Sequence, residues 1–228
     1  MAGVTWADLS PAWRAAFEEA WSAYCAGSLP IGACVADPAG VVVARGRNRL
    51  AEARAVDGFV AGHNLGHAEV NALLALPELA RPESYAHTLY TTVEPCPQCA
   101  GALGMSSLRG LNYAAPDAWS GCARLLTDDP YLGRKGFRVT RVPKALQRIC
   151  LVLLLAAVYQ DERTLSPASP YRAALQAAQP EALALAQDLF TLGVLPGWRS
   201  EGRSTAAVYA DLINAGGVSG LFNTASFN

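Results

Sequence analysis

The sequence lacks an apolar run long enough to cross a membrane. Its longest run, Ile149 to Tyr159, has 11 residues, whereas a membrane-spanning helix needs about 20. A secretory signal is also missing, because no basic residue precedes Arg14 and no long apolar stretch follows it. We therefore expect a cytoplasmic protein that has no membrane partner.

Charge of one sign is not in excess, and cysteine is sparse. The 18 basic and 19 acidic residues give a formal net charge of −1, which disfavours a protein held to nucleic acid by its overall charge but leaves room for a local basic patch. Six cysteines in 228 residues are too few for a disulfide-stapled domain. In a cytosolic chain, closely spaced cysteines point to metal binding or catalysis.

Hydrophobic patterning predicts alternating helices and strands. Ser10-Pro11 marks a helix start, since serine is a favoured N-cap and proline suits the first helical position. The turn Asp37-Pro38-Ala39-Gly40 lies between two β-rich runs and predicts a hairpin. The expected elements are strands over 31–36, 41–44, 88–93, 111–115 and 137–142, and helices from Pro11 and over 67–76, 96–107, 143–160, 171–192 (interrupted at Pro180) and 202–214. This alternation predicts a layered α/β sheet.

Four residues form the pattern that carries chemistry. Cys96 and Cys99 are three apart at an expected helix start, so they share a face, and the positive end of the helix dipole favours their thiolates. His67 adds a nitrogen from the neighbouring helix, and a Cys₂His set suits zinc. Glu69 lies two residues beyond His67, where it can stand beside the metal and accept a proton from a bound water without being a ligand.

This H-x-E…P-C-x-x-C pattern is a known signature of base deaminases. The chain resembles the cytidine deaminase superfamily, and within it the branch of tRNA adenosine deaminases, guanine deaminases and fungal-type cytosine deaminases. The resemblance runs from about Pro30 to Asp117, and its ordered segments are residues 30–33, 46–49, 66–73 and 89–102.

The resemblance implies a fold, a cofactor and a homodimer. The fold is a three-layer α/β/α sandwich around a mixed five-stranded sheet, which divides the chain into a zinc-dependent deaminase domain over 1–160 and a helical C-terminal extension packed on it over 161–228. One zinc ion per chain is held by His67, Cys96 and Cys99, and Glu69 shuttles protons. The Ala68 amide and the Asn48 side chain hold the base. Further candidates for substrate binding are Ile31, Glu94, Pro95 and Trp119, of which Trp119 can equally stack on a base or pack in the core.

Two segments depart from the resemblance. The stretch between Asn48 and His67 is longer than in tRNA adenosine deaminases, and we expect the added loop, 51–66, to lie near the pocket mouth. The chain beyond Val142 is also longer and can cover the site, form an interface or cap the sheet. The pocket walls are therefore expected from 51–66, from the segment around Trp119 and from the C-terminal region, so the sequence does not choose between a purine and a pyrimidine.

Three functions are compatible with these residues. The first is a zinc hydrolase that deaminates a free nucleobase, nucleoside or related aminated heterocycle and releases ammonia. The second is a deaminase of a base in tRNA or single-stranded nucleic acid, for which a basic run could contact phosphates, although a solvated face is the more frequent reading. The third is a non-catalytic zinc-stabilised binding module, whose metal needs a fourth protein ligand such as His63 or Cys122. The basic run comprises Arg134, Lys135, Arg138, Arg141, Lys144 and Arg148.

Overall fold

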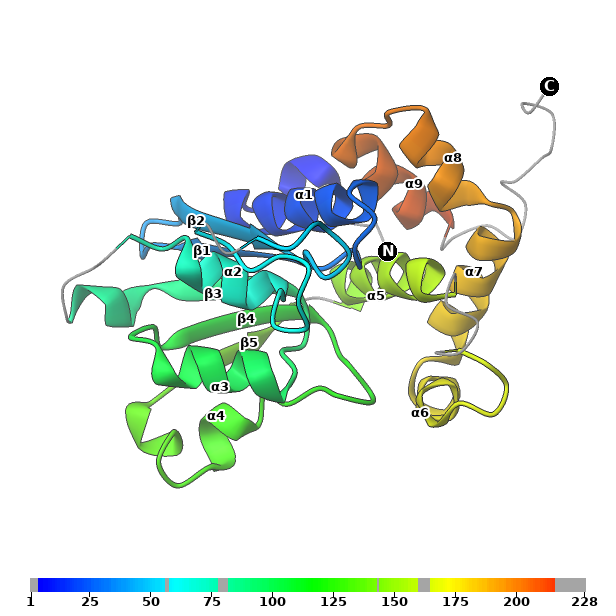
Figure 1. The fold of residues 1–228 in the computed structure, drawn as a ribbon. Helices are drawn as coiled ribbons and strands as arrows, with labels where there is room; N and C mark the ends of the chain where they lie inside the picture. Colours follow the sequence, from blue (N-terminus) through cyan, green and yellow to red (C-terminus); the bar gives the residue numbers. More distant parts are fainter. Residues whose placement is uncertain (1–3, 56–57, 78–81, 143, 160–164, 216–228) are drawn as a thin grey trace.

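The computed structural model describes residues 4–55, 58–77, 82–142, 144–159 and 165–215. At its centre is one mixed five-stranded sheet with the order β2-β1-β3-β4-β5 (Figure 1). The strands are β1 (Gly32–Ala36), β2 (Val42–Arg47), β3 (Thr88–Val93), β4 (Gly110–Ala115) and β5 (Arg138–Arg141). Strand β1 pairs antiparallel with β2 and β3, whereas β4 pairs parallel with β3 and β5. The expected mixed five-stranded sheet is confirmed.

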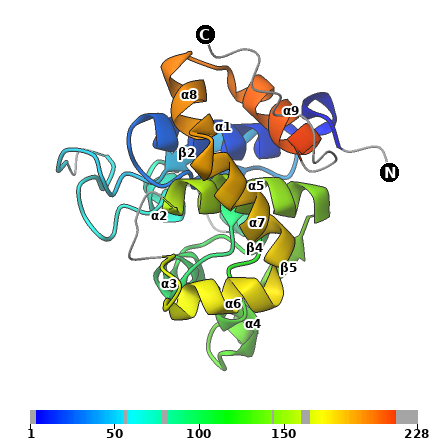
Figure 2. The same cartoon turned by 90° about the vertical axis from the view of Figure 1, so that its right-hand side faces the viewer.

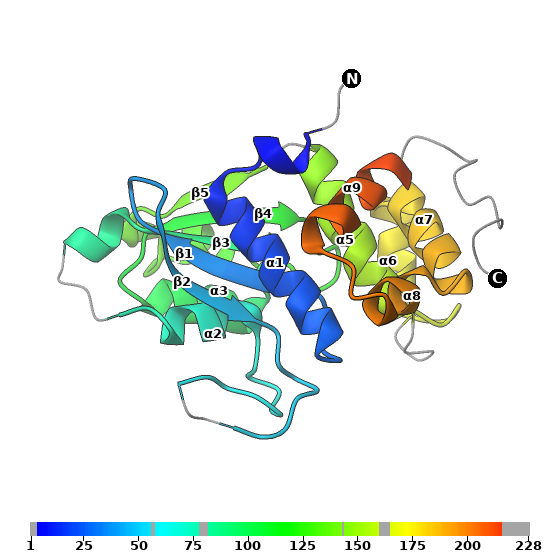
Figure 3. The same cartoon turned by 90° about the horizontal axis from the view of Figure 1, so that it is seen from above.

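Helices cover both faces of this sheet. The α-helices are α1 (Pro11–Cys25), α2 (Ala68–Leu74), α3 (Pro97–Met105), α4 (Leu125–Asp128), α5 (Lys144–Val158), α6 (Pro170–Ala178), α7 (Pro180–Thr191), α8 (Val194–Ser200) and α9 (Thr205–Ala215), and the 3₁₀ helices are η1 (Trp6–Asp8), η2 (Glu83–Ala86) and η3 (Gly133–Lys135). Helices α1 and α5 pack on one face and α2 and α3 on the other (Figures 1 and 3). This is the three-layer sandwich that the resemblance implies.

Two strand glycines let the helices pack directly against backbone. A Cβ atom on Gly32 would lie 2.1 Å from the carbonyl oxygen of Ala16 in α1. A Cβ atom on Gly46 would lie 2.2 Å from the backbone nitrogen of Ala72 in α2. Any larger residue would push the helix away from the sheet. Gly46 therefore holds α2, and with it the start of that helix, against β2.

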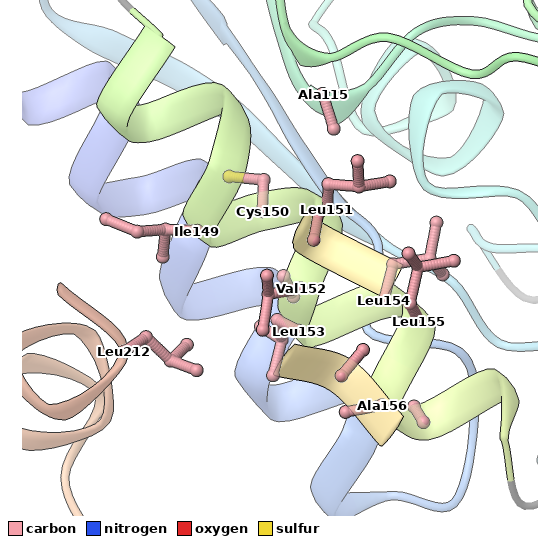
Figure 4. Close-up of a cluster of buried hydrophobic side chains, with 14 of the residues drawn as sticks. Ala115, Ile149, Cys150, Leu151, Val152, Leu153, Leu154, Leu155, Ala156 and Leu212 are labelled. Atoms are coloured by element: carbon pink, nitrogen blue, oxygen red, sulfur yellow. The ribbon is translucent and has the colours of Figure 1, made fainter. Parts of the chain in front are cut away.

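Helix α5 lies at the centre of the larger hydrophobic core. Every residue from Ile149 to Val158 is buried, because β3 and β4 cover one side of the helix and α7 and α9 cover the other. Figure 2 shows α7 crossing α5, and Figure 4 shows Leu212 of α9 on the same side of α5 as Ile149. The longest apolar run is thus a buried helix, as its length predicts. Within the described ranges, no helix has both the length and the apolar character that a bilayer-spanning segment requires.

Most expected elements are confirmed within a few residues. Ser10 caps α1 and accepts a hydrogen bond from the backbone N–H of Trp13. Helix α8 was not predicted, because Pro196 and Gly197 within it are typical of loops. Pro143, 160–164 and the tail 216–228 lie outside the described residues, and the division of the chain at residue 160 stays a prediction.

Candidate active site

The four chemistry-bearing residues lie at the starts of two neighbouring helices. His67 is the N-cap residue of α2 and Glu69 lies in its first turn. Cys96 is the N-cap residue of α3, and Cys99 lies one turn later. Because β3 and β4 are parallel, the segments that follow them, including the one that carries Cys96, leave the sheet at the same edge.

The histidine and the two cysteines are close enough to bind one ion. The sulfurs of Cys96 and Cys99 lie 3.5 Å and 3.4 Å from Nδ1 of His67, and all three ligand atoms lie within 4.8 Å of one another. Zinc bound tetrahedrally at its usual distances to nitrogen and sulfur would hold those atoms about 3.6 Å apart. The residues present therefore fit a single zinc ion.

No fourth protein ligand joins this group among the described residues. His63 instead accepts a hydrogen bond at Nδ1 from the backbone N–H of Leu65. Cys122 lies on the segment after β4, where its backbone N–H donates to the carbonyl of Pro95. A three-residue set that leaves one position open is typical of catalytic zinc, and four protein ligands are typical of structural zinc.

The two ligand sulfurs shift each other's pKa in opposite directions. The interaction with the Cys99 side chain lowers the pKa of Cys96 to about 4, and the same interaction raises the pKa of Cys99. The contact with Cys96 also raises the pKa of His67.

Glu69 is a buried carboxyl beside this group. It is only 3% exposed, and burial raises its pKa. Oε1 of Glu69 accepts a hydrogen bond from the Thr91 hydroxyl at 3.2 Å, and Oε2 accepts one from the Cys99 thiol at 3.3 Å. A carboxyl that is costly to ionise and fixed by two neighbours is suited to accept and return a proton.

A cavity of about 430 Å³ opens onto these residues, and His67, Glu69 and Cys96 form part of its lining. This volume lies in the range of small-molecule pockets. Of the predicted substrate-binding residues, four line the cavity: Ile31, Asn48, Glu94 and Trp119. Ala68 and Pro95 are buried and do not line it.

Asn48 presents a hydrogen-bond donor to the cavity. The side chain is 2% exposed, and its Oδ1 accepts a hydrogen bond from the backbone N–H of Leu50. Its Nδ2 atom makes no hydrogen bond to any described residue. Because a buried amide donor needs a partner, Nδ2 is free for an acceptor atom on a bound ligand.

Glu94 fastens the segment that carries Trp119. Its carboxylate accepts hydrogen bonds from the backbone N–H groups of Asp117 and Ala123, each at 3.3 Å. Asp117 in turn accepts from the backbone N–H groups of Trp119 and Ser120. Trp119 is consequently held at the cavity wall although its side chain is 59% exposed. Glu94 therefore positions this segment through hydrogen bonds to its backbone. The sequence did not indicate this role.

The 51–66 loop was expected to form part of the pocket wall. For the described residues of the loop, this prediction is wrong. None of them lines the cavity, and Val56 and Asp57 lie outside the described part of the chain. The loop is tied to α2 instead, because Asn71 accepts from the backbone N–H of Val60 at 2.7 Å and donates to its carbonyl at 3.1 Å. The side chain of Asn71 thereby satisfies both backbone groups of Val60.

The C-terminal region forms the remaining wall of the cavity. Leu154 and Val158 of α5 line the cavity, together with Ser169, Pro170 and Tyr171 at the start of α6. Burial, and then the charge of Asp117, raise the pKa of Tyr171, so its hydroxyl stays protonated at neutral pH. Ser169-Pro170 repeats the helix-start pattern of Ser10-Pro11 and marks where α6 begins, but no local pattern indicates that this start faces the metal group.

Residues 8–115 match the family model described as the cytidine and deoxycytidylate deaminase zinc-binding region. This part of the chain is similar to the zinc-binding region of the cytidine deaminase family. Over 115 residues, half of this chain, it is 34% identical to the tRNA-specific adenosine deaminase of Bacillus subtilis, and over 109 residues, 47% of this chain, it is 32% identical to the enzyme of that name from Haemophilus influenzae.

The fold also matches that of a solved structure. A mutant of the protein NE0047 in complex with 8-azaguanine is 23% identical with a TM-score of 0.53, and the match covers 66% of this chain and 84% of that one. This likeness shows the fold alone. The chain spans 65% and 58% of the length of the two bacterial relatives. Helices α5–α9 lie entirely beyond the family match, which ends at residue 115.

Proposed function

We propose that the chain is a zinc-dependent hydrolytic deaminase, which exchanges the amino group of an aminated heterocycle for oxygen and releases ammonia. The observation that carries this proposal is that the Cys₂His group and the buried Glu69 border one cavity of small-molecule size. A binding module that uses zinc only for stability has no need of a proton carrier at that place.

His67, Cys96 and Cys99 would hold the zinc ion, which lowers the pKa of a bound water to about 7. Glu69 supplies the proton movements. It accepts the two protons of the water in turn, the first as the oxygen adds to the ring carbon and the second as the C=O bond forms, and it delivers the first to the adjacent ring nitrogen and the second to the departing amine. The new C–O bond replaces the C–N bond, so water supplies the oxygen and ammonia is the second product. Asn48 Nδ2 orients the ring through an acceptor atom.

The substrate class that the cavity favours is a small heterocycle or nucleoside. Its wall includes Leu154, Val158 and Tyr171 from the same chain, so the site is covered by residues beyond the family match rather than open on that side. A base within tRNA is the second candidate, and the similarity to two bacterial tRNA-specific adenosine deaminases supports it. Such a substrate has to swing its base out of the stack and past this wall.

An ammonia-release screen tests the proposal. The zinc-loaded full chain is offered cytosine, guanine, adenine, their nucleosides, triazine and pterin analogues, and a tRNA pool. We expect release from a small heterocycle, and release about 10²–10⁴ times slower with Glu69→Gln. Release from tRNA alone would replace the first substrate class with the second. Release from nothing, while zinc is retained, would favour the binding module.

A homodimer and a cytoplasmic location remain part of the proposal. The resemblance implies the dimer, and exposed apolar side chains on α2 and α3, Leu74 and Met105, are compatible with a covered surface there. Light scattering on the purified full chain measures the mass directly, and a monomer at micromolar concentration would exclude the dimer.

A further inference from the structure

Two polar groups on the cavity lining have no part in the proton transfers described above. They are the carboxylate of Asp117, on the segment after β4, and the hydroxyl of Tyr171, at the start of α6. The two lie close together, since the charge of Asp117 acts on the hydroxyl of Tyr171 and raises its pKa. The fold therefore brings a carboxylate and a hydroxyl to one place on the cavity wall.

The charge of Asp117 has no cation as its partner. Among the described residues that line the cavity, none is an arginine or a lysine, and the ion pairs of the described residues do not include Asp117. A zinc ion would not change this balance, because its two positive charges equal the two negative charges of the Cys96 and Cys99 thiolates. The carboxylate of Asp117 is thus stabilised by hydrogen bonds alone.

The hydrogen-bonding capacity of both groups is only partly used. Oδ1 of Asp117 accepts from the backbone N–H groups of Trp119 and Ser120, and Oδ2 accepts from the Ser120 hydroxyl. A carboxylate has about four acceptor positions, so Oδ2 has capacity for one more donor. The Tyr171 hydroxyl makes no hydrogen bond to any described residue, and its raised pKa keeps it protonated at neutral pH. An acceptor and a donor are therefore both available to a ligand in the cavity.

Asp117 and Asn48 lie on opposite sides of the metal group. Strands β2, β3 and β4 run in the same direction, because β1 is antiparallel to β2 and β3, and β4 is parallel to β3. Their carboxyl ends meet at one edge of the sheet (Figure 1), where Asn48 follows β2, Cys96 follows β3 and Asp117 follows β4. Since β1 lies between β2 and β3, the ends of β2 and β4 are three strand spacings apart, about 14 Å. A ring beside the metal group can therefore face Asn48 with one edge and Asp117 with the other.

We propose that Asp117 and Tyr171 select the substrate by holding the edge of the heterocycle opposite the one that Asn48 holds. Asp117 accepts a hydrogen bond from an N–H or O–H donor on that edge, and Tyr171 donates to a neighbouring acceptor atom. The inference rests on the proposed function for the identity of the ligand as an aminated heterocycle. The favoured substrate accordingly carries a second donor besides the amino group that is removed. A ring without this donor would leave a desolvated carboxylate unpaired, which a polar site penalises strongly.

Equilibrium binding to the zinc-loaded full chain tests the proposal with pairs of compounds that differ in one donor. Cytosine with 1-methylcytosine and adenine with 9-methyladenine test a ring N–H, 2,6-diaminopurine with adenine tests a further amino group, and cytidine with 2′-deoxycytidine tests a ribose hydroxyl. In at least one pair we expect the donor-bearing member to bind at least about tenfold more tightly, since hydrogen bonds to charged groups are strong. The pair that shows this advantage identifies the source of the donor.

Asp117→Asn locates the effect. Asparagine keeps one oxygen for the backbone N–H groups of Trp119 and Ser120 but replaces the other oxygen with an NH₂ donor, so the advantage should disappear. A methyl group that merely fails to fit would be rejected equally by the variant, which separates hydrogen bonding from shape. Asp188→Asn is the matched control, because it makes the same change at an exposed residue of α7 that does not line the cavity. It should leave the advantage intact.

Tyr171→Phe is a second variant that keeps the ring and removes only the hydroxyl. The thermal midpoint should not fall, because no hydrogen bond between described residues is lost. Both members of the selected pair should bind about threefold to tenfold more weakly, as expected for one neutral hydrogen bond. Tyr131→Phe, at an exposed tyrosine outside the cavity lining, is its control and should change neither quantity.

Equal affinity within every pair, an advantage that persists in Asp117→Asn, or unchanged binding in Tyr171→Phe would overturn the proposal. These outcomes are distinguishable from failure of the proposed function. If ammonia is released from one of the compounds while no pair differs in affinity, the deaminase stands and selection by Asp117 is wrong. If the advantage depends on Asp117 while no compound releases ammonia, the recognition site stands and the deaminase is wrong.

Discussion

The cavity beside the metal group has two sides that the chain builds in different ways. The metal side comes from the starts of α2 and α3, and its polar atoms meet within hydrogen-bond distance. The opposite side comes from α5 and the start of α6, and its residues Leu154, Val158 and Tyr171 offer shape and one hydroxyl. In the proposed deaminase, the first side performs the reaction and the second determines which ring reaches it. Substitutions should therefore divide into those that stop the reaction and those that change its substrate.

The largest effect is expected from a metal ligand. Cys99→Ser removes one of three ligand atoms, so zinc content should fall well below one ion per chain and ammonia release should become undetectable. Cys122→Ser is the matched control. Cys122 is not part of the zinc group, and its contact with the Pro95 carbonyl is made by the backbone N–H, which serine retains. Elemental analysis of both variants measures the difference. Equal zinc in the two would mean that Cys99 is not a ligand.

Removal of the Glu94 carboxylate should have the next largest effect. Glu94→Ala leaves the backbone N–H groups of Asp117 and Ala123 without their acceptor, at about 1–3 kcal/mol of unfolding free energy each. The Trp119 segment should loosen, which raises KM more than it lowers kcat and leaves zinc bound. Steady-state kinetics and tryptophan fluorescence report the two changes.

The exposed Glu83 on η2 provides the control for that substitution, since Glu83→Ala removes a carboxylate remote from the cavity lining. If Glu94→Ala lowered kcat alone, with KM and fluorescence unchanged, Glu94 would be acting on the reacting atoms rather than through the segment that it fastens.

A substitution on the apolar side should alter substrate choice. Leu154→Ala removes a side chain that is 5% exposed, at about 2–5 kcal/mol of stability, and enlarges the cavity. The ratio of kcat/KM for a purine substrate to that for a pyrimidine should shift by several fold, because one or a few methylene groups change discrimination by about 1–3 kcal/mol. Leu153→Ala, a buried leucine of the same helix that does not line the cavity, should lose stability without the shift. An unchanged ratio in Leu154→Ala would show that this residue of α5 does not contribute to substrate selection.

The smallest effect on stability is expected at Trp119. Because the side chain is 59% exposed, Trp119→Ala should change the unfolding free energy by less than about 0.5 kcal/mol. If the indole stacks on the base, KM should nevertheless rise by about fivefold to a hundredfold. Thermal unfolding and KM measured on one preparation separate the two roles. A large loss of stability with unchanged KM would instead assign Trp119 to packing.

The sequence predicts the metal side better than the opposite side for a physical reason. His67, Glu69, Cys96 and Cys99 lie in two short segments whose spacing within a helical turn already fixes their relative placement. Leu154 and Tyr171 reach the cavity only through packing of α5 and α6 against distant strands, and nothing in their local sequence differs from ordinary core or linker residues. The 51–66 loop was misassigned because its tie to Asn71 is likewise a tertiary contact.

The same distinction applies to the fold. Ser10 and Ser169 each stand before a proline and each caps a helix, so these starts are encoded locally. Helix α8 contains Pro196 and Gly197, and its core contacts through Leu195 and Trp198 outweigh their low helix propensity. Local pattern thus identifies most helices and strands, whereas tertiary burial determines the exceptions.

The measurement that bears most directly on the central claim is a comparison of zinc content and ammonia release in the native chain and in Glu69→Gln, using the substrate found in the screen. Glutamine keeps the shape of the side chain but does not accept the proton. We predict one zinc ion per chain in both proteins and a kcat lower by about 10²–10⁴ in the variant. Equal rates in the two proteins, with zinc bound in both, would contradict the account.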